Sequence, residues 1–362
     1  MTSTRIIGAG SFVPDRVIDN DRIVKAIPGW TADQILQKSG IRERRFLWDF
    51  DERTGKAIPP PADVWPRTGT DMCEAALRLA LASARVDANE LDALFLVNAT
   101  ADVPDFCHDA LQLHKRFGMR SDAYADQFNS GCGGALYRLH LIRPLIESGA
   151  CKTVALVAAN LASAFLDRDV YTDPVVSADG KQLSGFLSMY LFGDGAAALI
   201  LRAEDATDAS GIIASVSGAD YSALMIREGG GAMLAPMSGR GTLGQFAYVI
   251  DGAKVAQCFL PFMRQCLDGV LAKCPQPAPP IGRYYLHQAN KRLVEAFVQS
   301  ANLPLDRVAM HMDRYGNTTA AGTLILLAED VANGVVKLGS GEVVLFAAIG
   351  AGIHYAAHVI RL

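Results

Sequence analysis

Short runs of apolar residues, bounded by turn residues and spaced far enough apart to leave room for a helix, set the strongest limit on the fold. Three such runs are Leu94 to Val97, Val154 to Ala158 and Ala196 to Leu201. Apolar runs of this length are typical of strands that are buried on both faces. The alternation of strand and helix therefore predicts an α/β protein built around a mostly parallel sheet.

The same rhythm occurs twice along the chain. In the first half, Thr70 to Ser83 and Gly133 to Glu147 carry apolar residues at helical spacing. After Gly211 the order restarts, with strands expected at Ile212 to Val216 and Arg283 to Leu286, helices from Ala253 towards Leu271 and from Thr318 to Val331, and two closing strands. We expect two similar halves, residues 1–205 and 206–362. No letter-by-letter repeat is visible, so one ordinary large α/β domain is the simpler alternative.

Two segments interrupt this rhythm and are interpreted as surface loops. Trp48 to Pro66 contains three consecutive prolines, and Asp167 to Ser184 contains Asp-Pro and Asp-Gly pairs. Loops of this length in a compact domain are often functional. We favour a functional role for the second loop because it leads directly into a strongly patterned strand.

Composition limits the function classes. The chain has 362 residues, of which 50% are hydrophobic and 20% charged, which is enough for a large core. The formal net charge is −4 and the basic residues are scattered, so no nucleic-acid groove is expected; the run Arg42, Arg44 and Arg45 is more typical of a solvated face than of a contact with an acidic partner. No apolar stretch reaches the roughly 18 residues of a membrane span. With no signal-peptide pattern and no C-x-x-C pair among seven cysteines, these features favour the cytoplasm.

A glycine-rich turn, Asn129-Ser130-Gly131-Cys132-Gly133-Gly134, opens one of the expected helices. A cysteine at a helix N-terminus faces the positive end of the helix dipole and unpaired N–H groups, which favour the nucleophilic thiolate. Cys132 is therefore a candidate nucleophile. A small residue in a tight structural turn is an equally good interpretation of this motif alone.

Two further motifs place polar side chains where strands or turns end. Tyr284-Tyr285-Leu286-His287-Gln288-Ala289-Asn290 puts His287 after a buried apolar run, where a helix is expected to begin, and ends of strands often expose catalytic groups in α/β enzymes. Gly316-Asn317-Thr318-Thr319 puts Asn317 on a turn before a helix. Taken singly, His287 is better explained as a structural histidine and Asn317 as a turn or cap residue.

Taken together, these motifs resemble the β-ketoacyl-acyl-carrier-protein synthase III group of the thiolase superfamily, over nearly the whole chain. Further similar segments are Gly40-Ile41-Arg42-Glu43-Arg44-Arg45 near the start and Leu191-Phe192-Gly193-Asp194-Gly195-Ala196-Ala197-Ala198 in the centre. The histidine and asparagine motifs lie thirty residues apart, as in the family. The Gly193-Asp194-Gly195 turn is assigned a structural role.

The resemblance implies a duplicated, five-layered α/β/α/β/α thiolase fold, usually a homodimer, and places the family's nucleophile on Cys132. Its paired hydrogen-bonding side chains fall on His287 and Asn317. An acyl group would pass from a carrier thioester to Cys132, and the enolate of a second thioester would then attack it. Backbone N–H groups of Cys132 and Ala351 would form an oxyanion hole. The substrates would be thioesters of acyl carrier protein or coenzyme A, with no metal or bound cofactor.

The sequence departs from the family where a tryptophan and an arginine clamp the adenine of coenzyme A. Those positions hold Gln34 and Lys38, so an aromatic surface and a guanidinium are expected to be missing, which favours a donor bound to carrier protein. The C-terminal glycine triplet reads Gly350-Ala351-Gly352, followed by Ile353, His354 and Tyr355. These changes favour polyketide or other specialised biosynthesis. Acyl transfer to an alcohol or amine, and a non-catalytic partner subunit of a heterodimeric synthase, stay open as alternatives.

Overall fold

Two sheets organise the computed structural model, which describes residues 2–176, 180–183, 185–205, 210–222, 224–235, 239 and 241–362. The first sheet has the order β1 (Thr2–Phe12), β11 (Gly195–Asp205), β8 (Thr153–Asn160), β6 (Ala93–Asn98) and β7 (Tyr124–Phe128). The second has the order β12 (Gly211–Ala219), β17 (His354–Arg361), β16 (Val343–Gly350) and β15 (Arg283–Leu286). The strands of each sheet come from one half of the chain, so we keep 1–205 and 206–362 as the proposed halves.

The sheets are mixed, so the prediction of a mostly parallel sheet is wrong. In the first sheet β6 pairs in parallel with β7 and β8, whereas β11 pairs antiparallel with β1 and β8. In the second sheet only β15 and β16 are parallel. Strands β16 and β17 are joined by three residues, a connection too short for a parallel crossover. A buried apolar run predicts a strand but carries no information about its direction.

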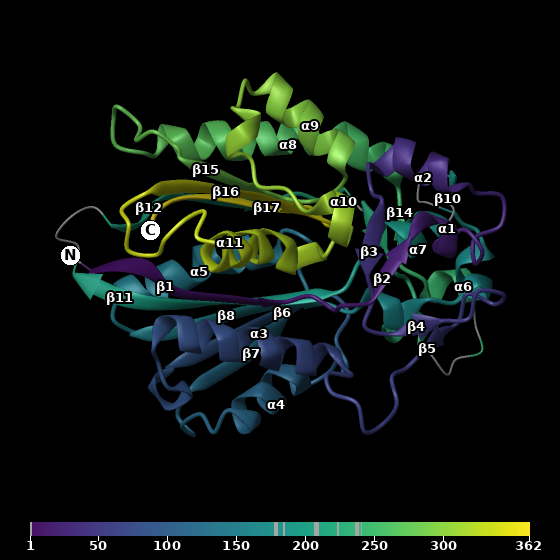
Figure 1. Cartoon of the computed structure of the whole chain (residues 1–362), viewed down its shortest axis with the longest axis horizontal. Coiled ribbons are helices and arrows are strands. Elements are labelled where there is room, and N and C mark those ends of the chain that lie inside the picture. The colour runs from purple at the N-terminus through teal and green to yellow at the C-terminus, as the bar shows by residue number, and fades with distance from the viewer. Residues whose placement is uncertain are drawn as a thin grey trace.

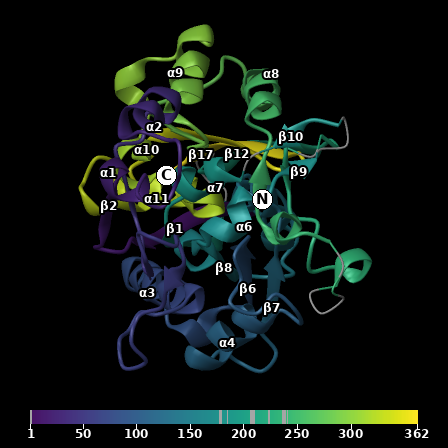
Figure 2. The same cartoon turned by 90° about the vertical axis from the view of Figure 1, so that its right-hand side faces the viewer.

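Helices fill the space between the sheets and cover both outer faces (Figure 1). Helices α5 (Gly134–Glu147) and α11 (Gly322–Ala332) lie between the sheets and contact both. Helices α3 (Gly69–Ala84) and α4 (His108–Arg116) cover the first sheet, and α8 (Gly252–Ala272) and α9 (Lys291–Ser300) cover the second, as the turned view in Figure 2 also shows. These are the five layers that the resemblance to the family implied.

Local sequence explains why α3 forms and how closely it packs. Thr68 caps its first turn in a reciprocal capping box with Asp71, and the helix ends where Arg85 adopts a left-handed conformation. Its buried residues recur at helical spacing on the face towards the sheet. A Cβ atom built on Gly10 of β1 would lie 2.4 Å from the backbone nitrogen of Ala80. Glycine in β1 therefore permits close packing of strand and helix.

The two segments expected to be loops contain short elements. Strands β4 (Asp49–Phe50) and β5 (Ala57–Ile58) pair inside the first segment. The second holds α6 (Arg168–Thr172) and the paired strands β9 (Val175–Val176) and β10 (Gln182–Leu183), while 177–179 and 184 lie outside the described residues. The remaining short elements around them are β2 (Val17–Asp19), α1 (Asn20–Ile23), α2 (Ala32–Ser39), β3 (Glu43–Arg45), α7 (Phe186–Leu191), β13 (Met225–Ile226), β14 (Val249–Ile250) and α10 (Met312–Tyr315).

Arg44 is fully buried, so the interpretation of its run as a solvated face is wrong for this residue. Its guanidinium donates to the carbonyl oxygens of Ile18 and Tyr190, at 3.0 and 2.9 Å, and to Oδ1 of Asn20 at 2.7 Å. Burial lowers the pKa of the guanidinium to about 9. In strand β3 successive side chains point to opposite faces, so the central arginine enters the core while its neighbours face outward.

The described helices include none that is both long and apolar enough to cross a membrane.

Candidate active site

Cys132 lies in the turn between β7, which ends at Phe128, and α5, which begins at Gly134. Glycines around it let two loops approach each other closely. A Cβ atom on Gly133 would lie 2.8 Å from the backbone nitrogen of Gly350, and one on Gly350 would lie 3.0 Å from that of Cys132. Gly131 has a φ of 60°, which favours glycine. The cysteine turn is therefore packed against the turn that joins β16 to β17.

His287 follows directly after strand β15, and its backbone N–H continues the ladder by donating to Ala347 at 2.9 Å. The side chain is 4% exposed and lies near the ring of Phe259, with 6.3 Å between ring centroids. Helix α9 begins at Lys291, later than expected, because Asn290 caps it by accepting from the N–H of Arg292. The histidine thus sits on the rigid end of a strand.

Asn317 is held in place by its backbone and by its side-chain oxygen. Its N–H donates to the carbonyl of Leu191 at 2.9 Å, and its carbonyl accepts from Gly193 at 3.1 Å. Its Oδ1 accepts from the N–H of Thr319 at 2.8 Å, which makes it a turn residue as well. The side-chain NH₂ group is thereby directed away from its own turn.

These three side chains meet. Cys132, His287 and Asn317 all line one pocket of about 60 Å³, which we call the central pocket; its other walls are mainly apolar and include Phe192 and Phe259. The Asn317 side chain also hydrogen-bonds the Cys132 thiol. Residues separated by 155 and 185 positions in the sequence therefore form one polar cluster in an apolar setting.

Burial sets the resting protonation state of the cluster. Part of Cys132 faces the pocket, but protein atoms surround the thiol, and burial raises its pKa to about 11. Hydrogen bonds from Asn317 and from the residue's own backbone act in the opposite direction and are smaller effects. Burial therefore outweighs the helix N-terminus, which was expected to favour the thiolate. Burial also lowers the pKa of His287 to about 3, so the imidazole is neutral at pH 7 and can donate a hydrogen bond, while the same shift makes it a weak proton acceptor.

Ala351, expected to supply an oxyanion-hole N–H, lies in the turn between β16 and β17 and lines the central pocket beside Cys132. A Cβ atom on Gly131 would lie 3.1 Å from the Ala351 nitrogen. The two backbone groups named from the sequence are thus neighbours, and their role as an oxyanion hole stays a prediction.

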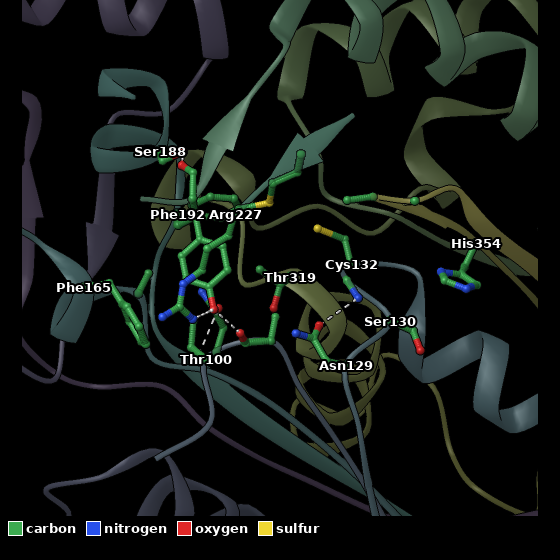
Figure 3. Close-up of a pocket in the computed structure, with 18 of the residues that line it drawn as sticks. Thr100, Asn129, Ser130, Cys132, Phe165, Ser188, Phe192, Arg227, Thr319 and His354 are labelled. Carbon is green, nitrogen blue, oxygen red and sulfur yellow. Dashed lines mark hydrogen bonds between the residues drawn. The ribbon is translucent and has the colours of Figure 1, made fainter. Parts of the chain in front are cut away.

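A larger pocket of about 300 Å³, the deep pocket, opens on the other side of Cys132 (Figure 3). It shares Cys132, Phe192, Met225 and Ala351 with the central pocket. Phe165, Arg227 and Tyr248 also line it, and sequence reasoning missed all three. They lie in irregular segments beside short strands or turns, where no periodicity or motif marks them.

An outer pocket of about 380 Å³ lies on the opposite side of the central pocket, with which it shares Leu191, Ile250, Val255 and Ala289. Trp30 and Lys38 line it, and the Lys38 ammonium lies 4.6 Å from the centre of the Trp30 ring. The prediction that this region lacks an aromatic surface is therefore wrong. Gln34 instead completes the capping box that begins α2 with Thr31, and the aromatic ring comes from the preceding loop.

Comparisons with known proteins agree on the class. The structure of the 3-oxoacyl-[acyl-carrier-protein] synthase III of Aquifex aeolicus superposes with a TM-score of 0.76 at 25% identity, over 99% of this chain and 100% of that one. A second synthase III structure gives a TM-score of 0.78 at 26% identity, with 99% and 100% coverage. The fold, and a cysteine, a histidine and an asparagine around one pocket, define a thiolase-fold condensing enzyme.

Sequence matches give the family. Family models described as 3-oxoacyl-[acyl-carrier-protein] synthase III and as its C-terminal part match residues 127–221, which include Cys132, and 277–362, which include His287 and Asn317. β-Ketoacyl-[acyl-carrier-protein] synthases III of Roseiflexus castenholzii and Xanthomonas oryzae are each 30% identical, over 98% and 99% of this chain and 97% and 98% of theirs. The chain belongs to the β-ketoacyl-[acyl-carrier-protein] synthase III family.

Proposed function

We propose that the chain loads an acyl group onto Cys132 and condenses it with a malonyl or β-ketoacyl thioester carried by acyl carrier protein. The observation that carries this proposal is the convergence of Cys132, His287 and Asn317 on the central pocket, which lies between two larger pockets. A thioester entering through the outer pocket reaches the cysteine, and the acyl chain extends into the deep pocket.

In the loading step the sulfur of Cys132 forms a bond to the acyl carbon while the bond from that carbon to the carrier sulfur breaks. Because burial keeps the resting thiol protonated, its proton has to leave during attack. His287, which lines the same pocket, is the group proposed to accept that proton as the sulfur attacks and to return it to the departing carrier thiolate. N–H groups of Cys132 and Ala351 stabilise the oxyanion of the tetrahedral intermediate.

In the condensing step a malonyl thioester loses carbon dioxide, and the resulting enolate attacks the acyl carbon on Cys132. A β-ketoacyl thioester would instead transfer a proton from the carbon between its two carbonyl groups to His287, which leaves the same type of nucleophile. The His287 imidazole and the Asn317 amide donate hydrogen bonds to the enolate oxygen as its charge develops. The carbon–sulfur bond to Cys132 then breaks, and the thiolate regains a proton.

The walls of the outer pocket fit a phosphopantetheine arm. Lys38 and Asn290 line it, and the Asn290 side chain donates to the backbone carbonyl of Lys38 at 3.0 Å, which joins α2 to the start of α9. The Arg292 side chain, on α9, donates to the backbone carbonyl of Gln37 on α2 at 3.4 Å. Cations at this opening would attract the phosphodiester of the arm and an acidic carrier surface.

We also propose a homodimer through the edge of the first sheet. Strand β7 is the last strand of that sheet in the described part of the chain, so no neighbouring strand pairs with its outer edge. Three large apolar side chains near it are exposed, at 92% for Phe106, 52% for Leu111 and 54% for Tyr124. Pairing of two β7 edges would cover them and satisfy the backbone groups of those edges.

Specialised biosynthesis, such as polyketide assembly, is the pathway class that we favour, because the adenine-clamp positions and the residues after the C-terminal glycine turn differ from the fatty-acid members of the family.

Acyl transfer to an alcohol or amine is the second candidate. His287 lines the same pocket as Cys132 and is the group that could take the proton of the acceptor.

Intact-mass spectrometry of the protein, incubated with acyl-carrier-protein and acyl-coenzyme A donors, tests the proposed function. We expect one acyl adduct on the wild type and none on Cys132→Ala, since a methyl group cannot attack a thioester. Cys258→Ala, which changes a partly buried cysteine on α8, is the matched control and should load normally. An adduct of unchanged mass on Cys132→Ala would contradict the proposal and would return the non-catalytic subunit to consideration.

A further inference from the structure

The deep pocket contains an arginine for which the condensing reaction described above has no use. Arg227 follows strand β13 and lines the deep pocket together with Cys132. In Figure 3 Arg227 and Phe165 lie on one side of this pocket and Cys132 on the other. An acyl group attached to the cysteine would therefore extend towards the guanidinium.

Aromatic side chains hold the Arg227 guanidinium in place. It lies 5.2 Å from the centre of the Tyr248 ring and 5.9 Å from that of Phe165, and those two rings pack edge to face at 5.4 Å. Its Nη1 donates to the Tyr248 hydroxyl at 3.2 Å, and that hydroxyl donates to the carbonyl of Ala99 at 2.7 Å. The Tyr248 carbonyl accepts from the hydroxyl of Ser188. Arg227 is exposed to solvent, and these contacts position its cation before any ligand arrives.

No carboxylate of the described residues pairs with this cation, and a guanidinium has five N–H donors, of which Tyr248 uses one. A further cavity of about 320 Å³ adjoins the deep pocket, and Asp102 lines it. The Asp102 carboxylate, however, accepts from the N–H groups of Gly69 and Thr70, at 2.8 and 2.7 Å, and from the Thr70 hydroxyl at 2.6 Å. Arg227 therefore retains donors for a ligand.

The rest of the wall suits the carbon chain of such a ligand. Phe165, Leu166, Phe192 and Met225 contribute apolar surface to the pocket, beside polar side chains such as Thr100 and Ser188. A largely apolar pocket with one placed cation favours a ligand that is apolar along its length and anionic at its end. Arginine binds carboxylates with paired, charge-assisted hydrogen bonds.

We propose that Arg227 selects acyl groups that end in a carboxylate, so that the donors are monothioesters of short dicarboxylic acids. This inference rests on the proposed function, because it requires the acyl group to be attached to Cys132. The thioester end reacts at the cysteine, and the free carboxylate binds the guanidinium beside Phe165 and Tyr248.

Matched donors of equal chain length test this proposal. Carrier-protein thioesters of succinate, glutarate and adipate are compared with those of butanoate, pentanoate and hexanoate, and the rate of adduct formation on Cys132 is followed by intact mass. We expect the wild type to load one or more dicarboxylic donors about 10- to 100-fold faster than the methyl-terminated partner, the effect of a charged hydrogen bond. Arg227→Gln should remove that preference by slowing the loading of dicarboxylic donors far more than that of methyl-terminated donors, while Arg227→Lys should keep part of it.

Arg120→Gln is the control, since it removes an exposed cation that already pairs with Asp92 and Asp122. Unchanged thermal unfolding of Arg227→Gln would exclude a merely structural effect. Faster loading of methyl-terminated donors at every length, or an equal loss of both donor types in Arg227→Gln, would overturn the role of Arg227 while the proposed function stands. Loading of no donor by the wild type would overturn the proposed function and, with it, this inference.

Discussion

Replacement of Asn317 separates condensation from simple acyl transfer. Its Oδ1 is occupied by the N–H of Thr319 at 2.8 Å, which leaves the NH₂ group as the part that can stabilise an enolate. Loss of one preorganised donor to a developing oxyanion typically slows a step by about 10²–10³-fold, or about 2.7–4 kcal/mol. We therefore expect Asn317→Ala to slow condensation by that factor.

Loading should respond differently, because no enolate forms in that step. The Asn317 hydrogen bond lowers the pKa of the Cys132 thiol, so its removal raises that pKa further and slows attack modestly at neutral pH. The matched variant Asn317→Asp keeps an oxygen for Thr319 but replaces the donor by a second acceptor, so it should lose condensation with its turn intact.

The assay follows the Cys132 adduct by mass, and then carbon dioxide and carbon–carbon product after malonyl-carrier protein is added. Near-normal loading of Asn317→Ala, with product formation reduced by two to three orders of magnitude in both variants, supports the condensing role. Asn317→Asp should load more slowly than Asn317→Ala, because its carboxylate lies beside the thiol and disfavours the thiolate. Product release close to the wild-type rate in either variant would refute it. A smaller loss, shared between loading and product release, would favour acyl transfer to an alcohol or amine.

Two further predictions rest on burial, and a third rests on the aromatic wall of the outer pocket. With a thiol pKa of about 11, only about 10⁻⁴ of Cys132 is thiolate at pH 7. The rate at which iodoacetamide alkylates Cys132 should therefore rise about tenfold per pH unit up to pH 10. A plateau in that rate below pH 9 would contradict this. Burial lowers the pKa values of His287, His311 and His358 to about 3, 4 and 3, so below pH 6.5 the unfolded chain binds protons that the native state does not. The free energy of unfolding should therefore fall as the pH falls from 6.5 towards 3, by about 2 kcal/mol for each histidine at pH 5. Urea unfolding that is unchanged between pH 7.5 and pH 5 would exclude this. If the Trp30 ring stacks on adenine, Trp30→Ala should slow loading from acyl-coenzyme A about tenfold and change loading from carrier-protein donors little. Equal effects on both donors would reject that stacking.

Local sequence predicts the elements well where one pattern dominates. Helices α3, α5 and α8 begin and end within a residue or two of their predicted bounds, because apolar spacing, caps and turn residues act over a few positions. Short paired strands such as β4 and β5 were missed, since two-residue strands have no period to detect. Arg44 shows the same limit, because alternation within a three-residue strand turns one charged residue of a charged run inward.

The sequence by itself determined the order and chemistry of the polar motifs, because Cys132, His287 and Asn317 each stand at a strand end or turn that local residues encode. Only the tertiary structure decided what surrounds them. Packing around the Cys132 thiol raises its pKa despite the helix N-terminus. Trp30 supplies the aromatic ring that Gln34 and Lys38 lack. Arg227 joins the cysteine through contacts between irregular segments far apart in the chain. Pocket walls are made by such distant contacts, and a linear pattern of residues does not record them.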